Sequence, residues 1–252
     1  MKFEFVTHCW QYWRCLTYQV SSFLLEPPKD SYAILSVVYC PDDEATTKRL
    51  EQIGAWMSKN GCPENFELRL HPLEKSMLFR RSIGRNMLAL NTEADWVWFC
   101  DCDMTFKGSA IDALAEELDR INSEDPDMTM VYPKRVRCTS QPAGDELIYS
   151  IKDEFEPVAL DYSSLGKKTY HAAIGGAQIV RQDVCHEEGY LDKYPQFRRP
   201  EYDHWKRTKE DPIFRRRCIG HRGLPVRNEK VVTGVARIRH TQRGRFDIGL
   251  EM

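Results

Sequence analysis

The chain has 252 residues, of which 42% are hydrophobic and 29% are charged, and its formal net charge at pH 7 is −2. These values are typical of a folded protein with one sizeable core, and they exclude a disordered or fibrous chain. No apolar run approaches the roughly 20 residues that cross a bilayer, and the first residues carry no signal-peptide pattern, so the sequence predicts a soluble protein.

The nine cysteines are an odd number and form no C-x-x-C pair. Cys100 and Cys102 flank Asp101 in a spacing that does not resemble a zinc site. We therefore expect reduced thiols and a cytoplasmic setting.

Charge is distributed unevenly along the chain. From Arg181 to the C-terminus there are 17 Lys and Arg against 11 Asp and Glu, whereas the first 180 residues hold 19 against 27. A basic C-terminal third predicts an anionic ligand near it, although a solvated charged surface would have the same composition.

Apolar runs alternate with segments of helical periodicity through the first half of the chain. This alternation predicts an α/β fold with a mainly parallel central sheet and helices on both faces. The expected strands are 3–6, 33–39, 66–70, 96–100 and 128–132. The expected helices are 10–25, 44–59, 76–90 and one that starts at Ser109 with Asp112 in a capping-box-like pair. Residues 133–168 have poor periodicity and are predicted to be irregular.

The strand at 96–100 ends abruptly in Asp101 and Asp103, which are separated by one residue. Unpaired burial of two carboxylates would be costly, so a cation is expected at this strand end. Hard oxygen ligands there suit Mg²⁺ or Mn²⁺, which would also hold the phosphates of a nucleotide. The alternative is that the pair caps the next helix or lies in a solvated turn.

Thr7 and Asp42 also fall at predicted strand ends. Ligands of parallel α/β sheets bind outside the carboxyl ends of the strands, so both residues are candidates for contacts to a nucleoside.

The helix before the aspartate pair carries Phe79, Arg81, Arg85 and Asn86. Arg81 and Arg85 are four residues apart and share a helix face, from which guanidinium groups could bind a diphosphate. A solvated basic face is the alternative interpretation.

Two further patterns lie toward the C-terminus. Gly175 and Gly176 permit close approach of the backbone to a ligand, and Glu210 and Asp211 follow about thirty-five residues later. Asp211 is a candidate general base, and Trp205 offers an aromatic face for a sugar ring.

The last pattern is Arg237-Ile238-Arg239-His240-Thr241. Its imidazole is a candidate to complete the coordination of a metal begun by the aspartates.

Taken in order, these motifs resemble the nucleotide-sugar glycosyltransferases of the GT-A fold, and within them the β-1,4-galactosyltransferase-like family. The chain is also similar to family-two inverting transferases. The resemblance covers roughly residues 79–241. The matching motifs are Phe79-x-Arg81-Ser82-x-x-x-Asn86, Trp98-Phe99-Cys100-Asp101-Cys102-Asp103, Gly175-Gly176, Gly189-Tyr190, Glu210-Asp211 and Ile238-Arg239-His240-Thr241.

The resemblance implies a GT-A fold made of one continuous domain. Residues 1–132 would form a nucleotide-sugar-binding α/β half, and residues 169–252 would follow the 133–168 excursion as an acceptor-side, catalytic lobe. The implied reaction is metal-dependent, inverting transfer of a sugar from a UDP-sugar to an acceptor hydroxyl of a glycan or another molecule.

The same resemblance assigns roles to individual residues. Asp211 would be the general base. Asp103 and His240 would bind Mn²⁺ or Mg²⁺, with Asp101 near the ribose or the metal. Donor contacts are expected from Phe79, Arg81, Arg85, Asn86, Asp101, Gly176, Trp205 and Glu210.

The lead-in to Glu210-Asp211 departs from the family, because residues 202–209 read Tyr-Asp-His-Trp-Lys-Arg-Thr-Lys. A nucleotidyltransferase is one alternative, but Thr7-His8-Cys9-Trp10 does not resemble the Gly-rich phosphate loop that such an enzyme usually has. Another alternative is a module that binds an anionic polymer on the surface of residues 198–245, with Arg215, Arg216 and Arg217 at its centre.

Overall fold

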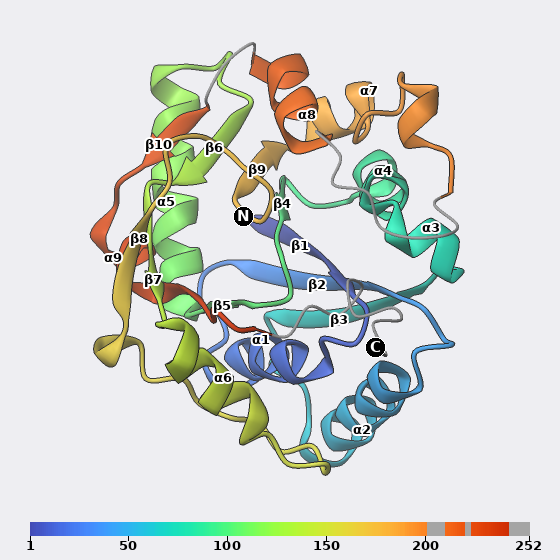
Figure 1. Ribbon diagram of the computed structural model, residues 1–252. Coiled ribbons are helices and arrows are strands. Elements are labelled where there is room, and N and C mark those ends of the chain that lie inside the picture. Colours follow the sequence, from blue (N-terminus) through green and yellow to red (C-terminus); the bar gives the residue numbers. More distant parts are fainter. Residues whose placement is uncertain (201–209, 220–222, 242–252) are drawn as a thin grey trace.

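The computed structural model describes residues 1–200, 210–219 and 223–241, and within them the chain forms two sheets flanked by helices (Figure 1). Trp205 lies outside the described residues. The main helices are α1 (Trp13–Leu25), α2 (Glu44–Asn60), α3 (Lys75–Phe79), α4 (Arg81–Asn91), α5 (Gly108–Glu124), α6 (Gln141–Tyr149), α7 (Gln182–Glu188), α8 (Glu210–Ile219) and α9 (Glu229–Gly234).

The central sheet has seven strands in the order β10-β6-β9-β4-β1-β2-β3. These strands are β1 (Lys2–Cys9), β2 (Tyr32–Tyr39), β3 (Phe66–Pro72), β4 (Trp96–Phe99), β6 (Met130–Pro133), β9 (Gln178–Arg181) and β10 (Leu224–Val226). All neighbours pair in parallel except β9, which runs antiparallel to β4 and β6. The predicted α/β fold with a mainly parallel sheet is thus confirmed.

A smaller sheet joins distant parts of the chain in the order β5-β11-β7-β8. Its strands are β5 (Met104–Phe106), β11 (Val235–Arg237), β7 (Arg135–Cys138) and β8 (Gly166–Thr169). β11 pairs antiparallel with β5, and Arg237 is the register partner of Met104. This pairing brings the C-terminal motif to the residues that directly follow Asp103.

The core forms because the central strands are covered on both faces, so most of their side chains are buried and apolar. Glu4 and Thr7 of β1 are buried polar exceptions. In Figure 1, α1 and α2 lie below β1, β2 and β3, whereas α3 and α4 lie above them. Rings from four elements meet in the core: Phe5 lies 5.1 Å from Phe23, 5.6 Å from Trp98 and 4.7 Å from Phe106 between ring centroids. No helix among the described residues is long and apolar enough to cross a membrane.

Three local expectations differ from the structure. The helix expected over 76–90 is interrupted at Arg80, whose φ of −91° and ψ of 85° separate α3 from α4. The capping box at Ser109 is wrong, because the Asp112 carboxylate instead accepts hydrogen bonds from the backbone N–H groups of Lys29, Asp30 and Ser31. The segment 133–168, expected to be irregular, contains β7, α6 and most of β8.

Candidate active site

A cavity of about 440 Å³ opens where β1 and β4 end. Its lining includes Phe79, Arg81, Asp101, Asp103 and His240, five of the residues singled out from the sequence. The position agrees with the general rule that ligands of parallel sheets bind beyond the carboxyl ends of the strands. The same cavity is also lined by Lys168, Arg237 and Arg239, which the sequence analysis did not assign to a site.

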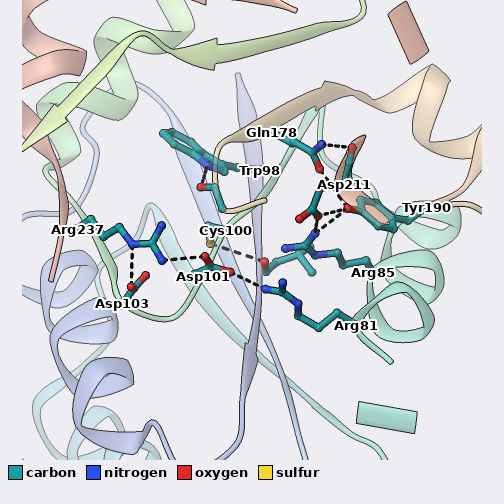
Figure 2. Close-up of polar contacts among 12 residues, drawn as sticks. Arg81, Arg85, Trp98, Cys100, Asp101, Asp103, Gln178, Tyr190, Asp211 and Arg237 are labelled. Carbon is teal, nitrogen blue, oxygen red and sulfur yellow. Dashed lines mark hydrogen bonds and ion pairs between the residues drawn. The ribbon is translucent and has the colours of Figure 1, made fainter. Parts of the chain in front are cut away.

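The two aspartates are held by two arginines (Figure 2). Arg81 Nη1 lies 2.8 Å from Asp101 Oδ1, and Arg237 Nη2 lies 3.3 Å from Asp101 Oδ2. Arg237 Nε lies 2.9 Å from Asp103 Oδ2. Burial raises the pKa of Asp103, while Arg237 acts in the opposite direction. The expected cation at this strand end is therefore present, and it belongs to the protein itself.

Arg237 is the functional candidate that the sequence analysis missed. The available signal was its place in the motif that contains His240, but its proximity to Asp103 depends on a pairing across more than 130 residues. The backbone fixes that proximity, because the N–H of Ile238 donates to the carbonyl of Asp103 over 2.8 Å.

A second cluster surrounds Asp211 in the first turn of α8 (Figure 2). Asp211 Oδ1 lies 2.6 Å from Arg85 Nη1 and 2.6 Å from the Tyr190 hydroxyl. Gln178 accepts from that hydroxyl over 3.2 Å and donates to the backbone carbonyl of Asp211 over 3.0 Å. The ring of Phe214, one turn along α8, packs against Phe99 and Tyr190 and holds the helix on the end of β4.

The charge state of Asp211 follows from these contacts. Burial is the largest single effect and would raise the pKa of Asp211. Arg85, Arg81 and the hydrogen bond from Tyr190 together outweigh it and keep the pKa below its usual value. Arg85 itself is almost completely buried, with 1% of its side chain exposed, whereas 23% of the Asp211 side chain is exposed. Asp211 is thus an ionised carboxylate near neutral pH, fixed by Oδ1 and partly open to solvent.

Gly175 and Gly176 lie between the two clusters. The antiparallel register of β9 with β4 pairs Gln178 with Phe99, so the residues before β9 run beside Asp101. A Cβ on Gly175 would lie 2.1 Å from Asp211 Oδ2, and a Cβ on Gly176 would lie 2.8 Å from Asp101 Oδ2. Gly176 also has a φ of +85°, which favours glycine. The glycine pair therefore leaves room for both carboxylates.

Arg85, Gly176 and Asp211 lie beside the cavity and outside its lining. Four other residues from the sequence analysis also lie outside the lining. Thr7 is buried in β1, and its hydroxyl has no hydrogen-bond partner among the described residues. Asp42 is exposed, and its neighbour Asp43 caps α2 instead. Asn86 accepts from the N–H of Tyr190 over 2.8 Å and so positions the phenol that contacts Asp211. Glu210 is buried and accepts from Ser82 over 3.2 Å.

Two arginines of the basic segment 215–217 make contacts within the protein. Arg215 donates to the backbone carbonyl of Ala173 over 2.8 Å, and Arg217 lies 3.4 Å from Glu188. Arg216 and Arg217 are nevertheless exposed, so the polymer-binding alternative stays a prediction.

The predicted metal ligands do not form a three-residue site. Asp103 Oδ1 and His240 Nδ1 are both buried without a hydrogen-bond partner among the described residues, as free ligand atoms would be. However, both oxygens of Asp101 and the second oxygen of Asp103 are in ion pairs with arginines. Across the described ranges, no group of three His, Cys, Asp or Glu side chains is arranged to hold a metal ion. The residues as placed do not fit a divalent ion.

Comparison with solved structures assigns the fold. A complex of S. aureus TarS (residues 1–349) with UDP-GlcNAc matches 97% of this chain with a TM-score of 0.56 and 12% identity. The mannosyltransferase PcManGT from Pyrobaculum calidifontis, in complex with GDP-Man and Mn²⁺, matches 96% with a TM-score of 0.54 and 14% identity. The chain has the GT-A fold.

The comparisons do not identify a family within the GT-A fold. At 12% and 14% identity the structural neighbours show the fold alone, and they do not identify the β-1,4-galactosyltransferase-like family. This chain spans 60% of the length of the TarS chain and 58% of the PcManGT chain. No protein-family model and no curated protein matches the sequence.

Proposed function

We propose that the protein is a glycosyltransferase that moves a sugar from a nucleoside diphosphate sugar, expected to be a UDP-sugar, to an acceptor hydroxyl. The observation that carries the proposal is the placement of the Asp101 and Asp211 carboxylates against consecutive glycines at one edge of a GT-A sheet. One carboxylate belongs to a cationic cavity suited to a diphosphate. The other is ionised and partly exposed, as a general base must be.

The charge and shape of the cavity support a nucleotide donor. Four cationic side chains, Arg81, Lys168, Arg237 and Arg239, line it together with the two carboxylates. Burial and the nearby Arg237 lower the pKa of Lys168, which reflects this crowding of positive charge. Trp10, Tyr12 and Phe79 add aromatic surface on which a base can pack. The compounds named with the two structural neighbours, UDP-GlcNAc and GDP-Man, are both nucleotide sugars.

The proposed reaction is a single displacement with inversion. Asp211 Oδ2 accepts the proton of the acceptor hydroxyl as that oxygen attacks the anomeric carbon of the donor. The bond from the anomeric carbon to the diphosphate oxygen breaks, and its electron pair leaves with the nucleoside diphosphate. Arg81 and Arg237 stabilise the charge that builds on the diphosphate. Arg85 and Tyr190 hold Oδ1 and so orient Oδ2.

The other donor contacts expected from the sequence remain part of the proposal. Phe79 and Arg81 line the cavity directly. Asn86 and Glu210 would act by holding Tyr190 and α4 in place. Thr7, Asp42 and Trp205 remain predictions. The divalent ion expected at Asp101, Asp103 and His240 enters no step, because those residues as placed do not fit it.

The proposal is tested by incubating the protein with a panel of UDP- and GDP-sugars and measuring release of the nucleoside diphosphate. Slow hydrolysis to water is expected even without the true acceptor, because Asp211 can deprotonate water in its place. Each assay is run in EDTA and in Mn²⁺. If no member of the panel is bound or consumed in either condition, the protein is not a nucleotide-sugar transferase.

A further inference from the structure

One guanidinium in the cavity bridges both aspartates of the D-x-D pair. Arg237 Nε reaches Asp103 Oδ2 over 2.9 Å and Arg237 Nη2 reaches Asp101 Oδ2 over 3.3 Å (Figure 2). The Arg237 side chain is 22% exposed and that of Asp103 is 10% exposed, so the bridge is largely shielded from water. The contact to Asp103 has the length of a strong charge-assisted hydrogen bond, and the contact to Asp101 is longer.

Strand pairing fixes the position of the Arg237 backbone beside Asp103. Arg237 is the last residue of β11, and β11 lies between β5 and β7 in the smaller sheet. The strand β5 begins at the residue after Asp103, so the pairing of Arg237 with Met104 and the bond from Ile238 N–H to the Asp103 carbonyl set the distance. Because strand pairing fixes the backbone at this ion pair, the pair differs from a surface ion pair between two flexible side chains.

The charges of the cavity leave little place for a second cation. Two carboxylates face Arg81, Lys168, Arg237 and Arg239, so the protein supplies a positive excess before any ligand enters. A divalent ion placed between Asp101 and Asp103 would have to displace Arg237 or lie against it. Only two candidate ligand atoms, Asp103 Oδ1 and His240 Nδ1, are buried without a partner among the described residues. Every other oxygen of the two aspartates is in an ion pair with an arginine, so a third protein ligand would have to break one of these pairs.

We infer that Arg237 takes the place of a divalent cation in this chain, so that it holds the aspartate pair and the donor diphosphate and makes donor binding independent of metal. This inference rests on the proposed function. A guanidinium can do this because its planar set of N–H donors can bind a carboxylate on one edge and a phosphate oxygen on the other. The positive charge of Arg237 would offset part of the negative charge that builds on the leaving diphosphate, as a metal ion otherwise does.

Binding of UDP and GDP to the full chain, measured by calorimetry, tests the inference apart from turnover. In EDTA the wild type should bind at least one of them, and Mn²⁺ should change that affinity by no more than about twofold. R237Q should weaken binding in EDTA by about tenfold or more. Mn²⁺ should restore part of the loss, because the substitution frees oxygens of Asp101 and Asp103. R120Q, at an exposed residue of α5, is the matched control and should bind as the wild type does.

Two further measurements test the inference even if R237Q does not fold. R237K keeps one positive charge but cannot bridge both carboxylates, so its affinity in EDTA should lie between those of the wild type and R237Q. Direct titration of wild type with Mn²⁺, followed by water proton relaxation, should show no stoichiometric site. A stoichiometric Mn²⁺ site that D103N abolishes would overturn the inference, as would UDP and GDP binding that needs Mn²⁺.

The two proposals fail in different ways. If nucleotide sugars are consumed only with Mn²⁺, the glycosyltransferase proposal stands and the role of Arg237 is wrong. If no nucleoside diphosphate or nucleotide sugar is bound or consumed in either condition, both proposals are wrong.

Discussion

The buried guanidinium of Arg85 donates to the carboxylate of Asp211 over 2.6 Å, and the same nitrogen lies 2.7 Å from the Tyr190 hydroxyl. These contacts occupy one oxygen of Asp211, while the other lies beside Gly175. A carboxylate with one fixed and one available oxygen is suited to accept a proton from a defined direction. All four predictions below concern this arrangement.

Replacing Asp211 by Asn should reduce turnover by about 10²- to 10⁴-fold, because the amide cannot accept the acceptor proton. The side-chain carbonyl can still accept from Arg85 and Tyr190, so affinity for the nucleoside diphosphate should stay near that of the wild type. Turnover by nucleotide release and affinity by calorimetry check both parts. D119N, on the exposed face of α5, controls for loss of a carboxylate elsewhere. Turnover in D211N equal to that of the wild type would remove Asp211 from the mechanism.

Replacing Arg85 by Met should destabilise the fold by about 3 kcal/mol, because it leaves Asp211 without its main partner in a largely buried site. Urea denaturation followed by tryptophan fluorescence measures the free energy of unfolding. R120M removes an exposed arginine whose ion pairs within the described ranges are with Glu117 and Glu124 of its own helix, and it should leave the midpoint nearly unchanged. Equal stability of R85M and R120M would contradict the role given to the buried pair.

Replacing Gly175 by Ala should lower turnover by about 10²-fold, because the added Cβ would lie 2.1 Å from Asp211 Oδ2 and must displace the proposed base. Gly54, inside α2, is the matched control, since a Cβ there meets nothing within 4 Å. G54A should keep turnover and raise the free energy of unfolding by about 0.5–1 kcal/mol. Normal turnover in G175A would show that the position of this carboxylate is not critical.

Much of the fold was predictable because its signals are local. The apolar runs of β1, β2 and β4 and the helical periodicity of α2 and α5 are visible without knowledge of tertiary contacts. The role of Asp112 was not predictable, since it depends on residues distant in sequence. Asp112 binds the loop at Lys29, more than 80 residues away, in place of capping its own helix.

The site residues also divide into those with a local sequence signal and those that depend on tertiary contacts. Asp101, Asp103 and Arg81 were found because they lie at one strand end or on the helix before it. Arg237 was missed because its role arises from the pairing of β11 with β5, for which the sequence gives no local signal. The glycine pair was singled out for close approach to a ligand, whereas in the structure it makes room for two carboxylates of the protein.

The contribution of Asp211 to the stability of the fold should be complete at neutral pH and should decrease only at acid pH. In the folded state burial raises the pKa of Asp211, but Arg85, Arg81 and Tyr190 together keep it below its usual value. The unfolded chain has the ordinary pKa of about 3.9. A carboxyl with a lowered pKa in the folded state stabilises the fold fully above the unfolded pKa, and this contribution is lost as the pH falls through the folded pKa. The difference in unfolding free energy between wild type and D211N should thus be constant above about pH 5 and shrink below about pH 4. Urea denaturation of both proteins across this range measures it, and a difference that instead grew on acidification would mean that the pKa of Asp211 is raised, not lowered, by its surroundings.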